Sequence, residues 1–255
     1  MIALFTQTRE YMMDLLLLSN GKIAGNTKVM EFALPAITEL LARKQVKNVL
    51  VIPYAVIRSS HDERTAMIAE SLSHLDVKVS GLHRAEDPVE AVRQADAIIC
   101  SGGNTWVLNK TLHDLGLIGP IQQAVTQRGV PYIGWSAGAV ISAPTIRTTN
   151  DMCIVSAAIT PSLGFVPFQI NAHYIDATIE GHMGETRDER IEEFLVVNPH
   201  QSVIGIPEGS WLAISGATMT YQAANGKPLH WFKLNQERKL VEAGSDVTDL
   251  MGLDG

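Results

Sequence analysis

The segment 131–141 has residue types and spacing that fit nucleophilic catalysis. Gly134, Ser136 and Gly138 form a G-x-S-x-G pattern between a short apolar run and a row of small residues that can open a helix. In that context a serine sits on a strained strand-to-helix turn, and the glycines remove side chains that would collide there. A helix N-terminus beneath the serine favours developing negative charge. The pattern predicts that Ser136 is a nucleophile, and the alternative is a glycine-rich packing turn.

A second glycine-rich turn can supply the donors that a serine nucleophile needs. Gly102 and Gly103 follow an apolar run and precede a predicted helix, so we expect their N–H groups at the same sheet edge as Ser136. With the N–H of Ala137 they are predicted to form an oxyanion hole. Asn104 of the same turn is predicted to bind substrate. The alternatives are that the glycines only shape a turn or that they bind a phosphate.

His173 is the histidine best placed to act as a general base. It lies near the end of the extended run 168–174, downstream of Ser136, whereas six of the eight histidines have mixed polar neighbours typical of the surface. His182 is the competitor, and with Glu185 it is a candidate pair of metal ligands. The sequence has no HExxH, no HxH and no cysteine pair, so we expect neither a metal nor a cofactor.

Composition narrows the classes of function. The 20 Lys plus Arg against 27 Asp plus Glu give a net charge of −7, and the basic residues are scattered, which argues against nucleic-acid binding. No apolar run approaches the roughly 18 residues that span a bilayer, and residues 1–7 lack the basic start of a secretory signal. The expected compartment is the cytoplasm. Cys100 and Cys153 are not in a CxxC pair, so no disulfide framework is expected.

The apolar runs alternate with segments of helical period, which indicates a mostly parallel sheet with helices on both faces. Continuous runs predict buried strands at 15–18, 49–52, 97–100, 132–133 and 203–206. Helices are predicted at 29–43, 62–75, 87–94, 105–115, 121–128 and 187–197. From about Ser210 the pattern alternates between turn signals, which predicts a small antiparallel appendage on the sheet edge. The chain has no linker and no repeat, so we expect one domain over 1–255.

Several longer motifs resemble the peptidase E family, the α-aspartyl dipeptidases. They occur in the family's order, from about Leu15 to Trp211. These motifs are 134–139 with 144–152, Gln169-Ile170-Asn171 with His173, Glu180-Gly181-His182 with 184–187, and 203–209. Mild departures, such as Ala172 before the histidine, bear on fine substrate preference.

This resemblance implies a flavodoxin-like α/β fold related to class I glutamine amidotransferases. It also implies a Ser-His-Glu triad, which falls on Ser136, His173 and Glu208. Glu208 follows a buried strand, where a carboxylate can orient the imidazole. Asp151, close after the serine turn, is the rival acid.

The resemblance further implies a small peptide substrate, a dipeptide whose first residue is aspartate, cut without a metal. Arg187 matches the family's aspartate-binding arginine, and a guanidinium suits a carboxylate. Alone, Arg187 would be interpreted as part of a charged first turn of a helix. The expected assembly is a monomer or homodimer, with no nucleic-acid or membrane partner.

Three other functions share some of these features. An α/β-hydrolase esterase also has G-x-S-x-G, but its acid precedes the histidine, whereas Glu208 follows His173. Cleavage of aspartyl polymers, as by cyanophycinase, needs loops that hold a polymer, and the chain has no evident long insertions. A non-catalytic binding module would leave Ser136 inert.

Overall fold

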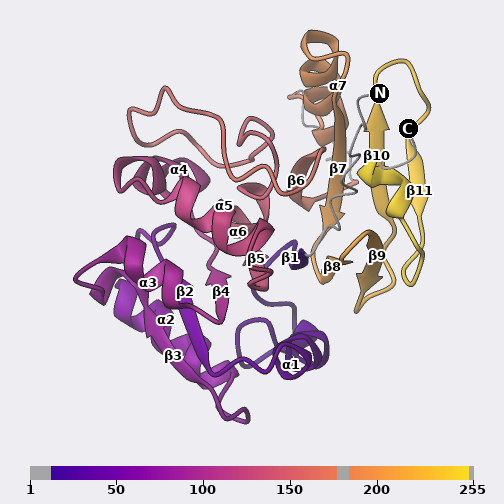
Figure 1. The fold of residues 1–255 in the computed structure, drawn as a ribbon. Coiled ribbons are helices and arrows are strands. Elements are labelled where there is room, and N and C mark those ends of the chain that lie inside the picture. Colours follow the sequence, from indigo (N-terminus) through magenta and orange to yellow (C-terminus); the bar gives the residue numbers. More distant parts are fainter. Residues whose placement is uncertain (1–12, 177–183, 253–255) are drawn as a thin grey trace, which may run out of the picture.

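The strands of the computed structural model, which describes residues 13–176 and 184–252, form two sheets (Figure 1). The larger sheet has the order β3-β2-β4-β5-β1-β8-β9, with its first five strands parallel and β8 and β9 antiparallel. Its strands are β1 (Asp14–Leu18), β2 (Asn48–Ile52), β3 (Lys78–Gly81), β4 (Ala97–Cys100), β5 (Tyr132–Trp135), β8 (Ser210–Ser215) and β9 (Thr218–Ala223). The predicted α/β fold with a mostly parallel sheet is confirmed.

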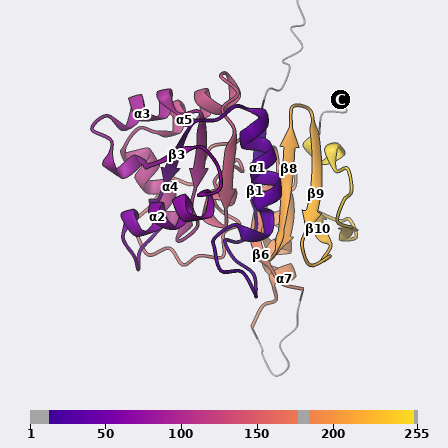
Figure 2. The ribbon, with the colours of Figure 1, turned by 90° about the horizontal axis from the view of Figure 1, so that it is seen from below.

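Helices cover both faces of the larger sheet, because its strands are apolar on both sides. The α1 and α2 side chains pack with one face, and those of α3, α4, α5 and α6 with the other. Figure 2 shows α1 running along β1 beside β8. The helices are α1 (Leu34–Arg43), α2 (His61–Ser71), α3 (Pro88–Gln94), α4 (Thr105–Asp114), α5 (Ile118–Thr126), α6 (Ala137–Val140) and α7 (Arg187–Val197), with 3-10 turns η1 (Glu31–Ala33), η2 (Leu82–Arg84) and η3 (Thr248–Met251).

The smaller sheet stands beside the larger one and has the order β11-β10-β7-β6 (Figure 1). Only its β6–β7 pair is parallel. Its strands are β6 (Gln169–Tyr174), β7 (Ser202–Pro207), β10 (Leu229–Lys233) and β11 (Lys239–Val241). Helix α7 packs on it through Ile191 and Leu195, which share a cluster with Tyr174 and Phe232. In the smaller sheet, β6 and β7 lie next to the edge of the larger sheet at which β1 and β5 end.

The register of the larger sheet brings three turns to one edge. Leu18 pairs with Trp135, and Cys100 pairs with Gly134, so β1, β4 and β5 end side by side. Parallel strands place their carboxyl ends together, and ligands commonly bind at that edge of an α/β sheet. The polar residues that follow these three strands are therefore neighbours in space.

The sheet assignment of the run 203–206 was wrong. This run forms most of β7, which lies in the smaller sheet and not in the main parallel one. The appendage after Ser210 is also divided, since β8 and β9 extend the larger sheet while β10 and β11 join β7. A buried apolar run has the same pattern in either sheet, so periodicity could not separate the two.

The predicted helices were found, with shifts at their ends. The helix expected over 29–43 begins at Leu34, after a 3-10 turn, and has proline in its first turn. The helix expected over 62–75 ends at Ser71, and that over 121–128 begins at Ile118. Strand β3 was not predicted because, as a partly exposed edge strand, it has no continuous apolar run. No helix in the described parts of the chain has the length and hydropathy needed to cross a bilayer.

We predict that Gly134→Ala destabilises the fold while Gly119→Ala does not. A Cβ on Gly134 would lie 2.3 Å from the carbonyl oxygen of Gly138, so β5 and α6 would have to separate. The expected loss is about 3 kcal/mol in the free energy of unfolding. Gly119, in α5, has no atom beyond its chain neighbours within 4 Å of such a Cβ. Alanine there should change the stability by less than about 1 kcal/mol, because its better helix propensity is opposed by contact with the ring of Pro120. Urea unfolding measures both, and equal midpoints would contradict the prediction.

Candidate active site

Ser136 occupies a strained turn at the carboxyl end of β5. It is the residue between β5 and α6, and its φ of 51° and ψ of −115° are rarely adopted by residues with a Cβ. Gly138 permits the close packing of this turn on β4, since a Cβ there would lie 2.2 Å from the carbonyl oxygen of Cys100. The turn has the geometry expected of the G-x-S-x-G pattern, with the serine between a strand and a helix.

A chain of hydrogen bonds links Ser136 to His173 and Glu208. His173 Nε2 lies 2.9 Å from Ser136 Oγ, and His173 Nδ1 lies 2.7 Å from Glu208 Oε1. When Nδ1–H donates to the carboxylate, Nε2 is left to accept the proton of the serine hydroxyl. The three groups thus stand in the order of a nucleophile, a base and an orienting acid.

His173 reaches the serine because β6 is bulged at this residue. The register between β6 and β7 shifts between Ala172 and Tyr174, and His173 has a φ of 54°. Such a bulge turns one side chain out of the regular alternation of a strand. Ala172 and Tyr174 remain buried, while the imidazole is partly exposed beside Ser136.

The end of β1 holds all three segments of this hydrogen-bonded chain. The carbonyl of Leu18 accepts the N–H of Ser136 at 3.0 Å, and Ser19 Oγ accepts the N–H of His173 at 2.9 Å. Ser19 Oγ also donates to the carbonyl of Ile206 at 2.7 Å.

Asn20, the next residue, binds the segment that contains Glu208. Its Oδ1 accepts the N–H of Gly209 at 2.8 Å. Ser19 and Asn20 are fully buried. Neither residue was singled out from the sequence. Their position after a strand buried on both faces is the signal that could have identified them.

Asp151 lies at the start of α4, away from the imidazole of His173. Its Oδ2 accepts the backbone N–H of Thr105 at 2.7 Å and also the Thr105 hydroxyl, so it caps the start of α4. The indole N–H of Trp106 donates to its backbone carbonyl at 3.1 Å. No hydrogen bond joins Asp151 to His173 within the described residues. Of the two acids considered from the sequence, only Glu208 contacts the imidazole.

The glycine-rich turn after β4 lies directly against the serine. A Cβ on Gly102 would be 2.9 Å from Ser136 Cβ, and one on Gly103 would be 2.0 Å from the carbonyl oxygen of Ala55. Across the described residues, no protein acceptor bonds the N–H groups of Gly102, Gly103 or Ala137. Gly102 and Ala137 therefore lie next to Ser136 with free N–H groups. Gly103 allows the turn to pack closely against the backbone of Ala55.

Arg187 faces a cavity of about 280 Å³ between the 147–152 segment and α7. It is the first residue of α7, whose start is fixed by a capping box between Thr186 and Glu189. The Arg187 guanidinium donates to Asn150 Oδ1, and Asn150 Nδ2 donates to the carbonyl of Ala172 at 2.7 Å. Asn150, which sequence reasoning missed, thus connects Arg187 to the residue before His173.

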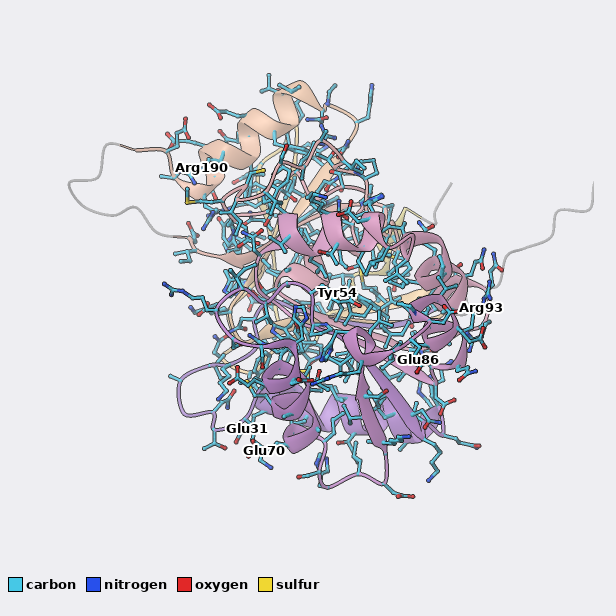
Figure 3. All side chains as sticks on the ribbon, turned by 90° about the vertical axis from the view of Figure 1, so that its left-hand side faces the viewer. Glu31, Tyr54, Glu70, Glu86, Arg93 and Arg190 are labelled. Atoms are coloured by element: carbon cyan, nitrogen blue, oxygen red, sulfur yellow. The ribbon has the colours of Figure 1, made fainter. Side chains whose placement is uncertain are left out.

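The charge of Arg187 is not balanced by an acid. Its partner is an amide, and no carboxylate lies within 4 Å of it among the described residues. Burial, and to a lesser extent the charge of Arg190, lowers the pKa of the Arg187 guanidinium. Arg190 lines the same cavity and is labelled on α7 in Figure 3. The cavity is therefore positive and suits an anionic group.

The prediction that Asn104 binds substrate gains no support from its contacts. Its Oδ1 accepts the N–H of Val107, which makes it the N-cap of α4, and its Nδ2 donates to the carbonyl of Met152. Both ends of the side chain are thus engaged within the protein. His182, the competing histidine, lies outside the described residues. In residues 13–176 and 184–252, no three His, Cys, Asp or Glu side chains gather as metal ligands would.

Comparison with known proteins identifies close relatives over nearly the whole chain. The profile of Peptidase family S51 matches residues 15–222. A protein named Peptidase E from Escherichia coli O6:K15:H31 is 44% identical over 232 residues, which cover 91% of this chain and 99% of that protein. Peptidase E of Citrobacter koseri has the same identity and coverage.

Solved structures share the fold. A protein of Listeria monocytogenes EGD-e, whose description includes Peptidase E, has a TM-score of 0.62 at 24% identity and covers 83% of this chain and 98% of its own. A peptidase from an acI-B1 actinobacterium has a TM-score of 0.67 at 17% identity, with 94% and 98% covered. At these identities the similarity supports the fold alone.

We predict that Ser19→Ala slows covalent labelling of Ser136 by a fluorophosphonate roughly tenfold, because a shifted imidazole activates the serine less well. The matched control is Ser162→Ala, which removes another buried serine whose Oγ donates to a distant carbonyl, that of Ala143, at 2.7 Å. Each variant should lose about 1 kcal/mol of stability. Mass spectrometry of the labelled protein gives the rates. Equal rates for the two variants would contradict a positioning role for Ser19.

Proposed function

The chain belongs to peptidase family S51, and on that premise we propose that it hydrolyses dipeptides with an N-terminal aspartate, using Ser136 as the nucleophile. The observation that carries the proposal is the hydrogen-bonded chain from Ser136 through His173 to Glu208. The α/β-hydrolase alternative is set aside because the matching family is a different one.

The geometry supports a two-step acyl transfer. Ser136 Oγ attacks the carbonyl carbon after the aspartate while His173 Nε2 takes its proton. Glu208 holds the Nδ1–H and stabilises the imidazolium that forms. The N–H groups of Gly102 and Ala137 stabilise the oxyanion.

The imidazolium then gives its proton to the leaving amine, which departs as the free second residue. A water molecule, activated by His173 in the same way, hydrolyses the aspartyl ester on Ser136 and regenerates the enzyme. The steps use side chains and backbone N–H groups of this chain and one water molecule, so the proposal needs no metal.

Arg187 is the proposed determinant of the first residue. The aspartyl carboxylate would enter the cavity beside α7 and pair with the guanidinium, whose partner among the described residues is an amide. Asparagine has nearly the same shape, but it would leave the arginine without a counter-charge. A site that binds through a buried polar group rejects the analogue that lacks its partner.

We predict that the purified protein cleaves Asp-Leu in the presence of a chelator and that Ser136→Ala loses at least roughly 10⁴-fold in kcat. Leu-Asp should be cut far more slowly, because it offers no carboxylate to Arg187 on the acyl side of the bond. Chromatographic detection of free leucine measures the reaction. Activity retained in Ser136→Ala, or lost with the chelator, would refute the proposed mechanism.

Arg187→Gln is expected to lower kcat/KM for Asp-Leu on the order of 10²-fold and to remove most of the preference over Asn-Leu. Arg187→Lys is the matched variant, because it keeps the charge without the bidentate fork, and its activity should lie between the two. Competition assays with Asp-Leu, Asn-Leu and Glu-Leu measure the preference. An unchanged ratio of Asp-Leu to Asn-Leu in Arg187→Gln would assign the specificity to other residues.

A further inference from the structure

Arg64 is a partly buried arginine without an acidic partner. It lies in the first turn of α2, and its Nε is buried with no acceptor among the described residues. Burial lowers the pKa of its guanidinium. Five other arginines of the described residues form ion pairs with carboxylates, namely Arg43, Arg84, Arg93, Arg190 and Arg238, whereas Arg58, Arg128 and Arg147, like Arg64, form none there. Arg64 therefore bears a desolvated charge that its own fold leaves unbalanced.

A path of close contacts leads from Ser136 to Arg64. The Arg64 guanidinium carbon lies over the indole of Trp135, 5.8 Å from the ring centroid. Trp135 immediately precedes Ser136, and its Nε1 would be 2.8 Å from a Cβ on Gly102. The same Cβ would be 2.9 Å from Ser136 Cβ. The indole therefore lies between the nucleophile turn and Arg64.

This path differs from the one that leads to Arg187. Arg187 is connected to His173 through Asn150 and the smaller sheet. Trp135 instead packs with α1 and α2 on the face of the larger sheet opposite α6. The two arginines are thus connected to the candidate site through different layers of the molecule, and each is partly buried without a carboxylate among the described residues.

A dipeptide with an N-terminal aspartate carries two carboxylates, one on each side of the bond that is cut. The aspartyl carboxylate is on the acyl side, and the terminal carboxylate is three bonds beyond the scissile carbonyl carbon on the leaving side. Two guanidinium groups without a carboxylate partner among the described residues, one connected to Ser136 through Trp135 and one to His173 through Asn150, match this charge pattern. Arg187 already accounts for the first carboxylate under the proposed function.

We propose that Arg64 binds the terminal carboxylate of the dipeptide and so determines that this peptidase prefers dipeptides. The proposal rests on the proposed function. In a longer peptide an amide replaces that carboxylate, and Arg64 would remain buried without a counter-charge, which disfavours binding. The ring of Trp135 holds the guanidinium in place through its negative face.

The test compares Asp-Leu with Asp-Leu-amide, which differs only in the terminal charge, for wild type, Arg64→Gln and Arg64→Lys. Wild type should prefer Asp-Leu at least tenfold in kcat/KM. Arg64→Gln should lose that preference through a raised KM for Asp-Leu, with less than a threefold change for the amide. Arg64→Lys should restore part of the preference. Arg93→Gln is the control, because Arg93 lies on α3 and not on α2, the helix of Arg64. Figure 3 shows Arg93 at the periphery, away from Tyr54, which belongs to the loop that leads into α2.

The amide substrate separates binding from folding. A purely structural role for Arg64 would lower the activity toward both substrates equally, and that result overturns the proposal. An unchanged preference in Arg64→Gln overturns it as well. If wild type cleaves Asp-Leu but Arg64→Gln behaves as wild type, only this inference fails. If wild type cleaves neither substrate, the proposed function fails and the inference with it.

Discussion

The end of β1 is the constraint on which the candidate site depends. The turn that holds Ser136 belongs to the larger sheet, whereas His173 lies in β6 and Glu208 follows β7, both strands of the smaller sheet. Two sheets that merely pack together can slide, but the 2.9 Å contact between Ser136 Oγ and His173 Nε2 tolerates little displacement. Leu18, Ser19 and Asn20 bind the three segments through directional hydrogen bonds inside the protein, where each bond would be costly to lose. The site is therefore assembled at the junction of two sheets and fixed by one strand end.

Backbone strain accompanies this arrangement. Ser136 and His173 both have positive φ values although both carry a Cβ, and each such conformation costs of order 1 kcal/mol or more. The strain persists because neighbouring elements determine it: the glycines on either side of Ser136 admit the close packing of β4, β5 and α6, and Ser19 holds the bulge at His173. In return, the hydroxyl and the imidazole leave the regular alternation of their strands and face each other. A regular strand would have directed the imidazole elsewhere.

Much of the fold and of the candidate site could be predicted from local sequence patterns, and the rest depended on tertiary contacts. Continuous apolar runs predicted the buried strands, and the glycines at 134 and 138 predicted a strained serine turn, because these signals lie within a few residues of one another. The choice between Glu208 and Asp151 could not be settled from spacing, since it depends on whether the carboxylate meets the imidazole or the start of α4. Ser19 lies more than 150 residues from His173 along the chain, so only the folded protein reveals its contact.

Net charge and local charge act in opposite directions in this molecule. The net charge of −7 repels an anionic ligand, but such long-range effects are screened beyond about 8 Å at physiological ionic strength. Short-range contacts must therefore decide whether a carboxylate binds. Arg64 and Arg187 are partly buried and have no carboxylate partner in residues 13–176 and 184–252, which departs from the general rule that buried charges are paired. Departures from such rules concentrate at functional sites. Their partners, the ring of Trp135 and the amide of Asn150, orient the guanidinium groups without neutralising them. Both cations consequently keep their capacity for an anion, which an acidic partner in the free protein would have removed.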